Sequence, residues 1–412
     1  MYDDLHATSV RLNADTQFTG KGVTIAFLDS GFHPHPDLAG RIRFYEDITG
    51  ERAALDSNDP IESWQWHGTQ TSVVAAGDGR LSDGVYSGLA HESQLVLVKV
   101  SENGRITEEN IARGIEWVIA NRACFNIRVL NISLGGDEDV PCTRSIIDQA
   151  AEEAIRNGIV VVAAAGNSGA EGRHSIPPAN SPLVVTVGGY HDNNQPNGNS
   201  LDLYHSNFGP TADGTVKPEI VAPAKWIAAP TLPVTPDLSA PYQHVDGTSF
   251  AAPIVTSIVA QMIEVNPQLT PGAIKNILIS TADRIAGAAA IRQGYGVVNA
   301  RRAVALAKQE QHTLNTVGCS PPRVQNGHLV FVYHDDEARH VSLAGDFNDW
   351  NPASHPLTQD TSGLWLCKLA PPGPGRYEYK FVVDDRRWIE DPSNGMKVSD
   401  GFDGLNSLLS IR

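Results

Sequence analysis

From residue 23 to about residue 308, short apolar runs alternate with amphipathic segments. The runs are rich in Val, Ile and Leu, and they cover residues 23–29, 95–100, 127–133, 159–164 and 183–187. Continuous apolar runs of this length are typical of strands that are buried on both faces of a parallel sheet. Such strands, separated by helical segments, predict a doubly wound α/β fold.

Helix starts are marked by residues that can cap the first free backbone N–H groups. Thr107 precedes an amphipathic segment over residues 108–121, and Asn299 precedes another over residues 300–308. Thr270 precedes a proline, which is favoured at the first position of a helix. We therefore expect a helix to begin after each of these three residues.

The pattern changes after residue 308. Residues 309–327 are polar and show no periodicity, which is typical of a linker. Farther on, strand-like runs are separated by turn residues and cover residues 328–333, 340–344, 363–369, 376–383 and 407–411. They predict a small all-β, immunoglobulin-like sandwich. We therefore expect one domain over residues 1–308, a linker over 309–327 and a second domain over 328–412.

Charge narrows the possible partners. The chain has 412 residues, of which 47 are acidic and 31 basic, so its formal net charge is -16. Binding to nucleic acid or to an anionic membrane needs basic surface, so we expect neither partner. No apolar run has the length of a membrane span, and residues 1–4 include acids where a signal peptide is basic. We expect a cytoplasmic protein; the alternative is a secreted one whose signal and propeptide are absent from this chain.

The four cysteines agree with a reducing compartment. Cys124, Cys142, Cys319 and Cys367 form no CxxC pair and no cluster with metal-ligand spacing. Ordinary reduced thiols are the favoured interpretation. A disulfide between Cys124 and Cys142 stays open as the alternative.

Three short motifs carry candidate chemistry. Asp29 ends an apolar strand, His67 precedes a run of small and apolar residues, and Ser249 begins another apolar run. A serine hydroxyl becomes a good nucleophile when a histidine takes its proton, and a carboxylate can orient that histidine. A helix that starts at the serine adds a favourable dipole for developing negative charge. Each motif alone is common, so their combination carries the hypothesis.

The order Asp, His, Ser is the order of the subtilisin triad, and residues 5 to 308 resemble the subtilisin-like serine proteases in the motifs around each residue. The resemblance implies a serine endopeptidase with Asp29, His67 and Ser249 as its triad, acting on proteins or peptides. Asn167 then supplies a side-chain donor to the oxyanion. The same resemblance places four residues in the substrate cleft: Ser133, Leu134, Gly135 and Gly166.

The chain departs from the subtilisin pattern in ways that bear on metals. Gln70 replaces a second histidine, which we expect to leave the chemistry unchanged. Residues 78–88 lie where some relatives bind calcium, and Asp78 and Asp83 are candidate ligands of a structural calcium ion. A plain surface turn is the favoured alternative. The resemblance implies no cofactor for the chemistry itself.

Two more positions next to prolines need an interpretation. Ile176 precedes Pro177-Pro178, and an approximate alignment places it in the primary specificity pocket, where it favours small or medium apolar side chains. His33-Pro34-His35 suggests a metal site, but residues on either side of a proline are restricted in conformation. We favour an ordinary loop there.

The C-terminal segment carries the motif GDFNDW at residues 345–350, then a strand-like run with three aromatic residues and a further tryptophan. It resembles the glycogen- and starch-binding modules of AMP-activated kinase β subunits and branching enzymes. Sugar rings present apolar faces that suit aromatic platforms, and their hydroxyls need placed polar partners. The resemblance implies that four residues bind glucan: Trp350, Lys380, Trp388 and Asn406.

The alternative for these tryptophans is packing in the sandwich core or against the protease. We assign Trp365, in mid-strand, to the core, and we expect Phe402 to add an apolar contact to the sugar. The favoured reading is a protease that its module targets to glycogen or starch. Two rivals remain: a glucan-binding scaffold without proteolysis, and a protease whose β domain only stabilises the fold.

Overall fold

The computed structural model describes residues 6–51, 54–56, 64–136, 140–169, 174–194, 201–231, 241–309, 322–325, 327–335, 338–359, 364–394, 397–402 and 404–411. The chain divides into two compact units. The first comprises Met1–Asp213 and Lys217–Lys308, and the second comprises Gly214–Val216 and Gln309–Arg412. Each unit has its own hydrophobic core and is described by itself.

An eight-stranded sheet forms the centre of the first unit, with the strand order β12-β8-β7-β6-β1-β3-β2 and β9 paired to β8. Its strands are β1 (Thr24–Asp29), β2 (Ile42–Asp47), β3 (Gln94–Lys99), β6 (Ile127–Ile132), β7 (Val160–Ala164), β8 (Val185–His191), β9 (Asp202–Leu203) and β12 (Ile220–Pro223). All pairs except β8–β9 are parallel. The predicted α/β fold with a parallel sheet is confirmed.

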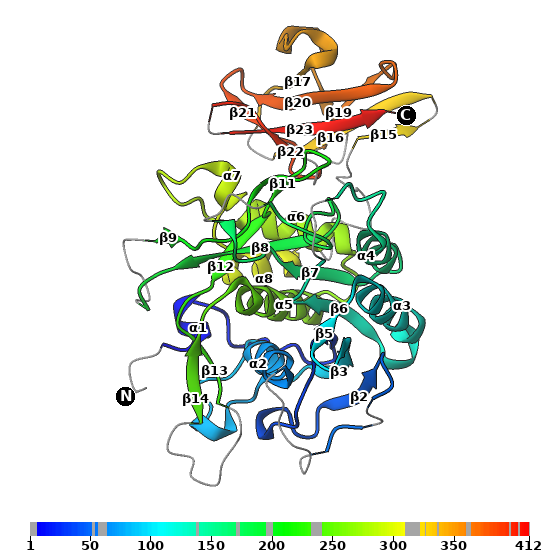
Figure 1. Cartoon of the computed structure of the whole chain (residues 1–412). Coiled ribbons are helices and arrows are strands. Elements are labelled where there is room, and N and C mark those ends of the chain that lie inside the picture. Colours follow the sequence, from blue (N-terminus) through cyan, green and yellow to red (C-terminus); the bar gives the residue numbers. More distant parts are fainter. Residues whose placement is uncertain are drawn as a thin grey trace. The chain divides into compact units, whose positions relative to one another are not determined.

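Alternate side chains of each strand face opposite sides of the sheet. In β1, Ile25 and Phe27 belong to one buried cluster, whereas Ala26 and Leu28 belong to the other. Helices α2 (Gln65–Ala76), α5 (Thr248–Val265), α6 (Pro271–Thr281) and α8 (Ala300–Gln309) supply the first cluster. Helices α3 (Glu108–Phe125) and α4 (Ile146–Arg156) lie side by side in Figure 1 and supply the second.

Smaller elements complete the first unit. They are α1 (Thr8–Arg11), α7 (Ala290–Gln293), the short 3-10 turns η1 (Pro36–Leu38) and η2 (Arg80–Ser82), and the strand pairs β4 (Ser101–Glu102) with β5 (Arg105–Ile106) and β13 (Ile227–Pro230) with β14 (Tyr242–Val245). Strand β10 (Gly209–Pro210) pairs with β11 (Val216–Lys217), whose residue Val216 is assigned to the second unit.

The three predicted helix starts are confirmed by their caps. Thr107 accepts a hydrogen bond from Asn110 N at 3.2 Å, and Thr270 accepts one from Ala273 N at 3.2 Å. Asn299 accepts one from the backbone of α8 at 2.9 Å. Helix α3 continues to Phe125, beyond the expected end at residue 121, because its last turns pack an aromatic ring against β2.

Helix α5 is long and apolar enough to cross a membrane by length and composition alone, which the sequence interpretation had not recognised. Its apolar window is 89% buried in the first unit. It is therefore the central core helix, between α2 and strands β6, β7, β8 and β12.

The second unit consists of two antiparallel sheets. One has the order β15 (Arg323–Gln325), β16 (His328–His334), β19 (Leu364–Leu369) and β18 (Thr358–Gln359). The other has the order β17 (Val341–Gly345), β20 (Gly375–Val383), β23 (Leu405–Ile411) and β22 (Lys397–Ser399), with β21 (Arg387–Ile389) paired to β20 and the turns η4 (Asp346–Asn348) and η5 (Pro352–Ser354) nearby. Both sheets contribute to one core, which confirms the predicted sandwich.

The structure corrects two expectations, the extent of the linker and the alternative of a disulfide. Residues 323–325 form strand β15, so the linker interpretation is wrong for them; pairing with β16 decides their conformation. Residues 310–321 of the expected linker, with Cys319, lie outside the described residues. Cys124, Cys142 and Cys367 are free thiols, so the Cys124–Cys142 disulfide is wrong.

Candidate active site

Asp29 stands at the carboxyl end of β1, where it is 1% exposed. Its Oδ1 accepts hydrogen bonds from Nδ1 of His67 and from Ser30 N, both at 2.7 Å. Its Oδ2 accepts one from Oγ1 of Thr71 at 3.1 Å. The carboxylate is thus held in one orientation, facing the histidine.

His67 lies in the first turn of α2, and its ring is 5.9 Å from the ring of Phe250. Burial lowers the pKa of His67, but the charge and hydrogen bond of Asp29 raise it by more, so it ends above the usual 6.5. With Nδ1–H donated to Asp29, the other ring nitrogen is the one that can accept a proton. This is the arrangement of a general base.

Gly68 explains how α2 comes so close to β1. A Cβ atom there would lie 2.2 Å from the carbonyl oxygen of Gly31 and 3.0 Å from Cβ of Asp29, so no larger residue fits. The adjacent Thr69 fixes the helix by accepting a hydrogen bond from His33 N at 2.8 Å. Gln70 donates to the carbonyl of Pro230 at 3.0 Å and so ties α2 to β13.

Ser249 lies in the first turn of α5. Its Oγ donates to the carbonyl oxygen of Ser133 at 3.3 Å, and Oγ of Ser133 donates to the carbonyl oxygen of Ser249 at 2.9 Å. Gly247 precedes the helix with a φ of 139°, a backbone conformation that residues other than glycine rarely adopt. The structure therefore brings Ser249 beside the predicted cleft segment. Its backbone N–H lies in the first turn of α5.

Asn167 is oriented by a residue that the sequence did not single out. Its Oδ1 accepts hydrogen bonds from N and Oγ1 of Thr248, at 2.9 and 3.0 Å. These two bonds leave the amide nitrogen as the donor end of the side chain, 3.5 Å from where a Cβ atom at Gly247 would lie. Gly166 has a φ of 100°, and a Cβ there would lie 2.6 Å from the side chain of Asn207.

The cleft segment of residues 133–136 runs beside the loop that follows residue 174. Gly136 N donates to the carbonyl oxygen of Pro177 at 2.9 Å. A Cβ at Gly135 would lie 2.8 Å from that carbonyl oxygen and 3.3 Å from Cγ1 of Ile176. Leu134 is half-buried against the α3 and α4 side of the core. Ile176 and the predicted cleft residues therefore come together.

Sequence reasoning missed the residues that hold the triad in place. Thr71 bonds Asp29, Thr248 orients Asn167, and Ser30 donates to the carbonyl of Trp64 at 2.6 Å, just before α2. Each lies within a few positions of a motif residue, but a threonine or serine there gives no signal of its own. Only the packing of α2 and α5 against the sheet shows what these hydroxyls contact.

Among the described residues, neither candidate metal site brings together three side-chain ligands of the His, Cys, Asp or Glu type. Both carboxylate oxygens of Asp78 accept hydrogen bonds from Arg80, and Asp83 is exposed. His33 and His35 are buried in a loop, where Nδ1 of His33 is 3.0 Å from the carbonyl of Pro34. The described residues contain no group of three or more His, Cys, Asp or Glu side chains that could hold an ion.

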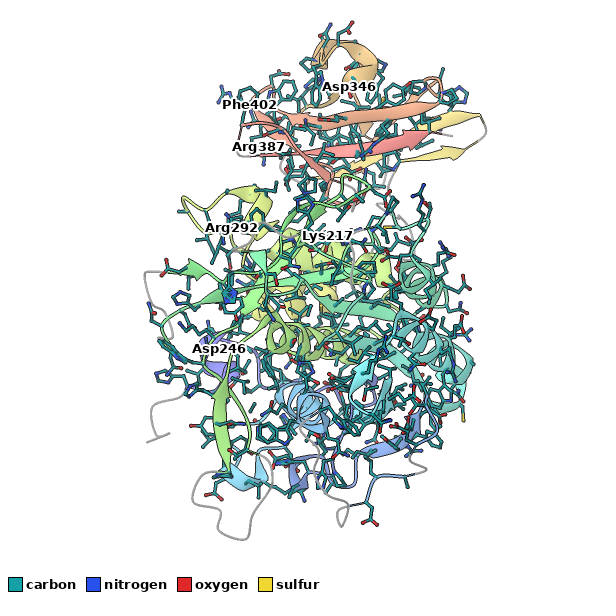
Figure 2. All side chains as sticks on the ribbon, in the orientation of Figure 1. Lys217, Asp246, Arg292, Asp346, Arg387 and Phe402 are labelled. Atoms are coloured by element: carbon teal, nitrogen blue, oxygen red, sulfur yellow. The ribbon has the colours of Figure 1, made fainter. Side chains whose placement is uncertain are left out.

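In the second unit, Trp350 and Trp388 lie with their ring centroids 6.4 Å apart and their planes 33° from each other. Trp388 is 44% exposed, and Nε1 of Trp350 donates to Asp346 at 2.9 Å. Phe402 is 91% exposed, and Figure 2 labels it at the same edge of this unit as Arg387. Trp365 is in the core, as predicted.

The two polar candidates of this unit are bonded to acids. Nζ of Lys380 donates to Asp400, and Nδ2 of Asn406 donates to Glu378, both at 2.7 Å. Asn406 is 7% exposed. An ammonium has three hydrogens and an amide two, so each bond leaves donors for other acceptors.

Comparison with known proteins identifies both units. Residues 20–298 match the subtilase family, and residues 316–394 match carbohydrate-binding module 48, the type of the isoamylase N-terminal domain. Serine protease AprX of Bacillus subtilis is 35% identical over 319 residues, which are 73% of this chain and 70% of AprX. Subtilisin NAT of Bacillus subtilis subsp. natto is 31% identical over 291 residues, which are 69% of this chain and 66% of that protein.

A solved structure supports the same assignment. A protease of Pseudoalteromonas arctica is similar with a TM-score of 0.59 and 25% sequence identity, over 74% of this chain and 100% of that one. The family match covers the unit that holds Asp29, His67 and Ser249. The chain therefore belongs to the subtilase family of serine endopeptidases, and it carries a carbohydrate-binding module of family 48.

Proposed function

We propose that Ser249 is the nucleophile of a peptide-bond hydrolysis for which His67 is the base. Oγ of Ser249 turns from the carbonyl of Ser133 and attacks the peptide carbonyl carbon, while its proton passes to the free ring nitrogen of His67. His67 then gives that proton to the leaving amine as the C–N bond breaks. Water attacks the acyl-enzyme, with His67 again taking the proton, and releases the second product.

The hydrogen bond between His67 and the buried Asp29 carries this proposal. It sets the tautomer of His67 and stabilises the imidazolium that forms when the proton arrives. Asn167 and the backbone N–H of Ser249 are the proposed donors to the oxyanion. Such donors act because they already point at charge that develops only in the tetrahedral intermediate.

Covalent labelling tests the nucleophile. A fluorophosphonate, which reacts with activated serines, should add one group to the chain, and peptide mapping should place it on Ser249. The Ser249→Ala chain should take up none. Labelling of another serine at the same rate would contradict the assignment.

Ile176 supports a proposal about specificity. A Cβ at Gly135 in the cleft segment would lie 3.3 Å from Cγ1 of Ile176, so we expect this branched side chain to limit the size of the residue that the cleft accepts. We therefore propose cleavage after small or medium apolar residues. Profiling of cleavage sites in a mixture of denatured proteins tests this, with Ile176→Ala expected to accept larger residues. A wild-type profile dominated by large aromatic residues would contradict it.

The carbohydrate partner is proposed to be an α-1,4-glucan such as glycogen or starch. Consecutive glucose units of these chains turn about the chain axis, so two rings tilted by 33° suit them better than coplanar rings do. Phe402, almost fully exposed, adds apolar area on the same unit, and Lys380 and Asn406 keep donors for sugar hydroxyls. The module then brings the protease to glucan or to proteins bound there.

Retention on glycogen-coupled resin tests the glucan proposal. The wild-type chain should be retained, and the double substitution Trp350→Ala with Trp388→Ala should remove retention. Trp66→Ala is the matched control, since Trp66 is 38% exposed but lies in the other unit. If the doubly substituted chain is still retained, or if the wild-type chain is not retained, the result would favour a module that only stabilises the fold.

We propose a cytoplasmic location because the free thiols Cys124 and Cys142 are at least partly exposed, a state that reducing compartments preserve. Fractionation of the source cells tests this, and recovery from the culture medium would contradict it.

A further inference from the structure

The loop of residues 78–88 follows α2 and returns the chain to β3. It lies beside Asp37, whose side chain is completely buried. The sequence marks Asp78 and Asp83 of this loop as candidate calcium ligands. A calcium ion needs six to eight oxygen ligands at 2.3–2.6 Å. The question is therefore whether the oxygens around this loop are available to an ion.

The carboxylate of Asp78 is engaged by a guanidinium group. Nε of Arg80 lies 3.2 Å from Oδ1 and 3.0 Å from Oδ2, and Nη2 lies 2.5 Å from Oδ2. The backbone N of Arg80 also donates to Oδ1, at 3.1 Å. Asp78 is thus an ionised carboxylate whose counter-charge comes from this chain.

The oxygens of Asp37 are also directed at donors. Its carboxylate accepts hydrogen bonds from the hydroxyl of Tyr242 and, at 3.4 Å, from Leu81 N. Its carbonyl oxygen accepts from Asp78 N at 3.0 Å and from the guanidinium of Arg41. Donors from the loop, from β14 and from the segment before β2 therefore surround this residue.

Several carbonyl oxygens at this loop close its turns. Gly79 O accepts hydrogen bonds from Ser82 N at 2.8 Å and Gly84 N at 2.9 Å, and also from Oγ of Ser82 at 2.9 Å. Ser82 O accepts from Val85 N at 3.0 Å, and Gly77 O accepts from Gly88 N at 2.9 Å. These acceptors would have to give up their bonds before they could bind an ion.

We infer that Arg80 takes the place of a cation in the 78–88 loop, so that this loop is held without calcium. The guanidinium provides the positive charge and the directional bonds that an ion would provide to Asp78. The thermal stability of the chain should then not depend on calcium at this loop. This inference is independent of the proposed catalytic and glucan-binding functions.

Melting temperatures of the full chain test the inference, measured in excess chelator and in millimolar calcium. The wild-type chain should melt at the same temperature in both. Arg80→Ala should melt lower by about 1 to 2 °C in chelator and should recover in calcium, because Asp78 is then open to the ion. Arg156→Ala is the matched control: Arg156 is similarly exposed and pairs with Glu152 and Glu153 on α4.

The inference is overturned if calcium raises the melting temperature of the wild-type chain and Asp78→Asn abolishes that rise. It is also overturned if Arg80→Ala shows no response to calcium. A calcium response of the wild type that persists in Asp78→Asn places the ion elsewhere and supports the inference for this loop. Calorimetric titration with calcium alone provides a second readout of binding to the Arg80→Ala chain.

Discussion

The carboxylate of Asp29 lies 2.7 Å from Nδ1 of His67 and is almost completely buried. His67 can act as a base only when it is neutral. Burial lowers its pKa and Asp29 raises it by more, so activity should rise with pH through a value above 6.5. Single residues therefore set both the rate and the pH range of the proposed reaction.

Asp29→Asn tests this at the residue scale. The substitution keeps the shape but removes the charge and reverses the hydrogen-bond preference, so kcat should fall about 10,000-fold. The acid limb of kcat/KM should also move to lower pH, because the negative charge that raises the pKa of His67 is gone. Kinetic profiles against pH measure both effects.

Asp283→Asn provides the control for this measurement. Asp283 is exposed and pairs with Arg302, and its loss should leave the profile unchanged. An Asp29→Asn enzyme with the wild-type acid limb would show that another group controls the titration.

At this scale, the sequence could predict the residues that react but not those that hold them. Asp29, His67 and Ser249 each stand in a recognisable motif, and Asn167 follows a strand in one. Thr71 and Thr248 have no such signal, because their hydroxyls find Asp29 and Asn167 only after α2 and α5 pack against the sheet. The same holds for Arg80, whose partner is set by the shape of a turn.

Among the elements, α4 contains a carboxylate that is buried away from solvent. Asp148 in its first turn is completely buried, and burial raises its pKa from 3.8 to about 7. An acid whose pKa is raised on folding costs stability when it must ionise. The stability that the fold has with Asp148 protonated is fully retained below pH 3.8 and is lost as the pH rises through about 7.

Asp148→Asn should therefore stabilise the chain in alkali. At pH 8.5 the free energy of unfolding should increase by about 2 to 4 kcal/mol, whereas below pH 3.8, where Asp148 is protonated in both states, it should change little. Denaturant titrations at both pH values measure this. Glu153→Gln, on the exposed side of the same helix, should change neither value. An equal effect of Asp148→Asn at both pH values would mean that packing, not ionisation, dominates.

The elements that the sequence missed have physical reasons for being missed. Strand β2 lies at the edge of the sheet and is mostly exposed or half-buried, so it has no continuous apolar run. Helix α4 has a clear amphipathic pattern, and its buried side includes three small alanines and the polar Asp148, which do not form an apolar run. Strand β15 has three residues and depends on pairing with β16. The expected strand at residues 183–187 starts at Val185 and continues to His191.

At the scale of the whole molecule, two units with separate cores carry the two candidate sites. The sequence predicted both units from the change in hydrophobic pattern, and its motifs supplied the candidate residues of each site. It could not predict that Lys380 and Asn406 bond Asp400 and Glu378, because these contacts join separate strands and loops.

The two sites should act independently in simple assays. Trp350→Ala with Trp388→Ala should digest a soluble denatured protein at the wild-type rate. Ser249→Ala should bind glycogen resin as well as the wild type does. Parallel rate and retention measurements check this, and a large loss of proteolysis in the tryptophan variant would show that the module supports the enzyme itself.

Digestion of a denatured, unlabelled protein by the purified chain tests the central claim most directly. It should be compared with Ser249→Ala and with Ser257→Ala, a buried serine of the same helix whose Oγ donates to Ile254 O. The account predicts fragments from the wild type and from Ser257→Ala, and none from Ser249→Ala. Equal digestion by all three chains, or none by the wild type, would contradict it.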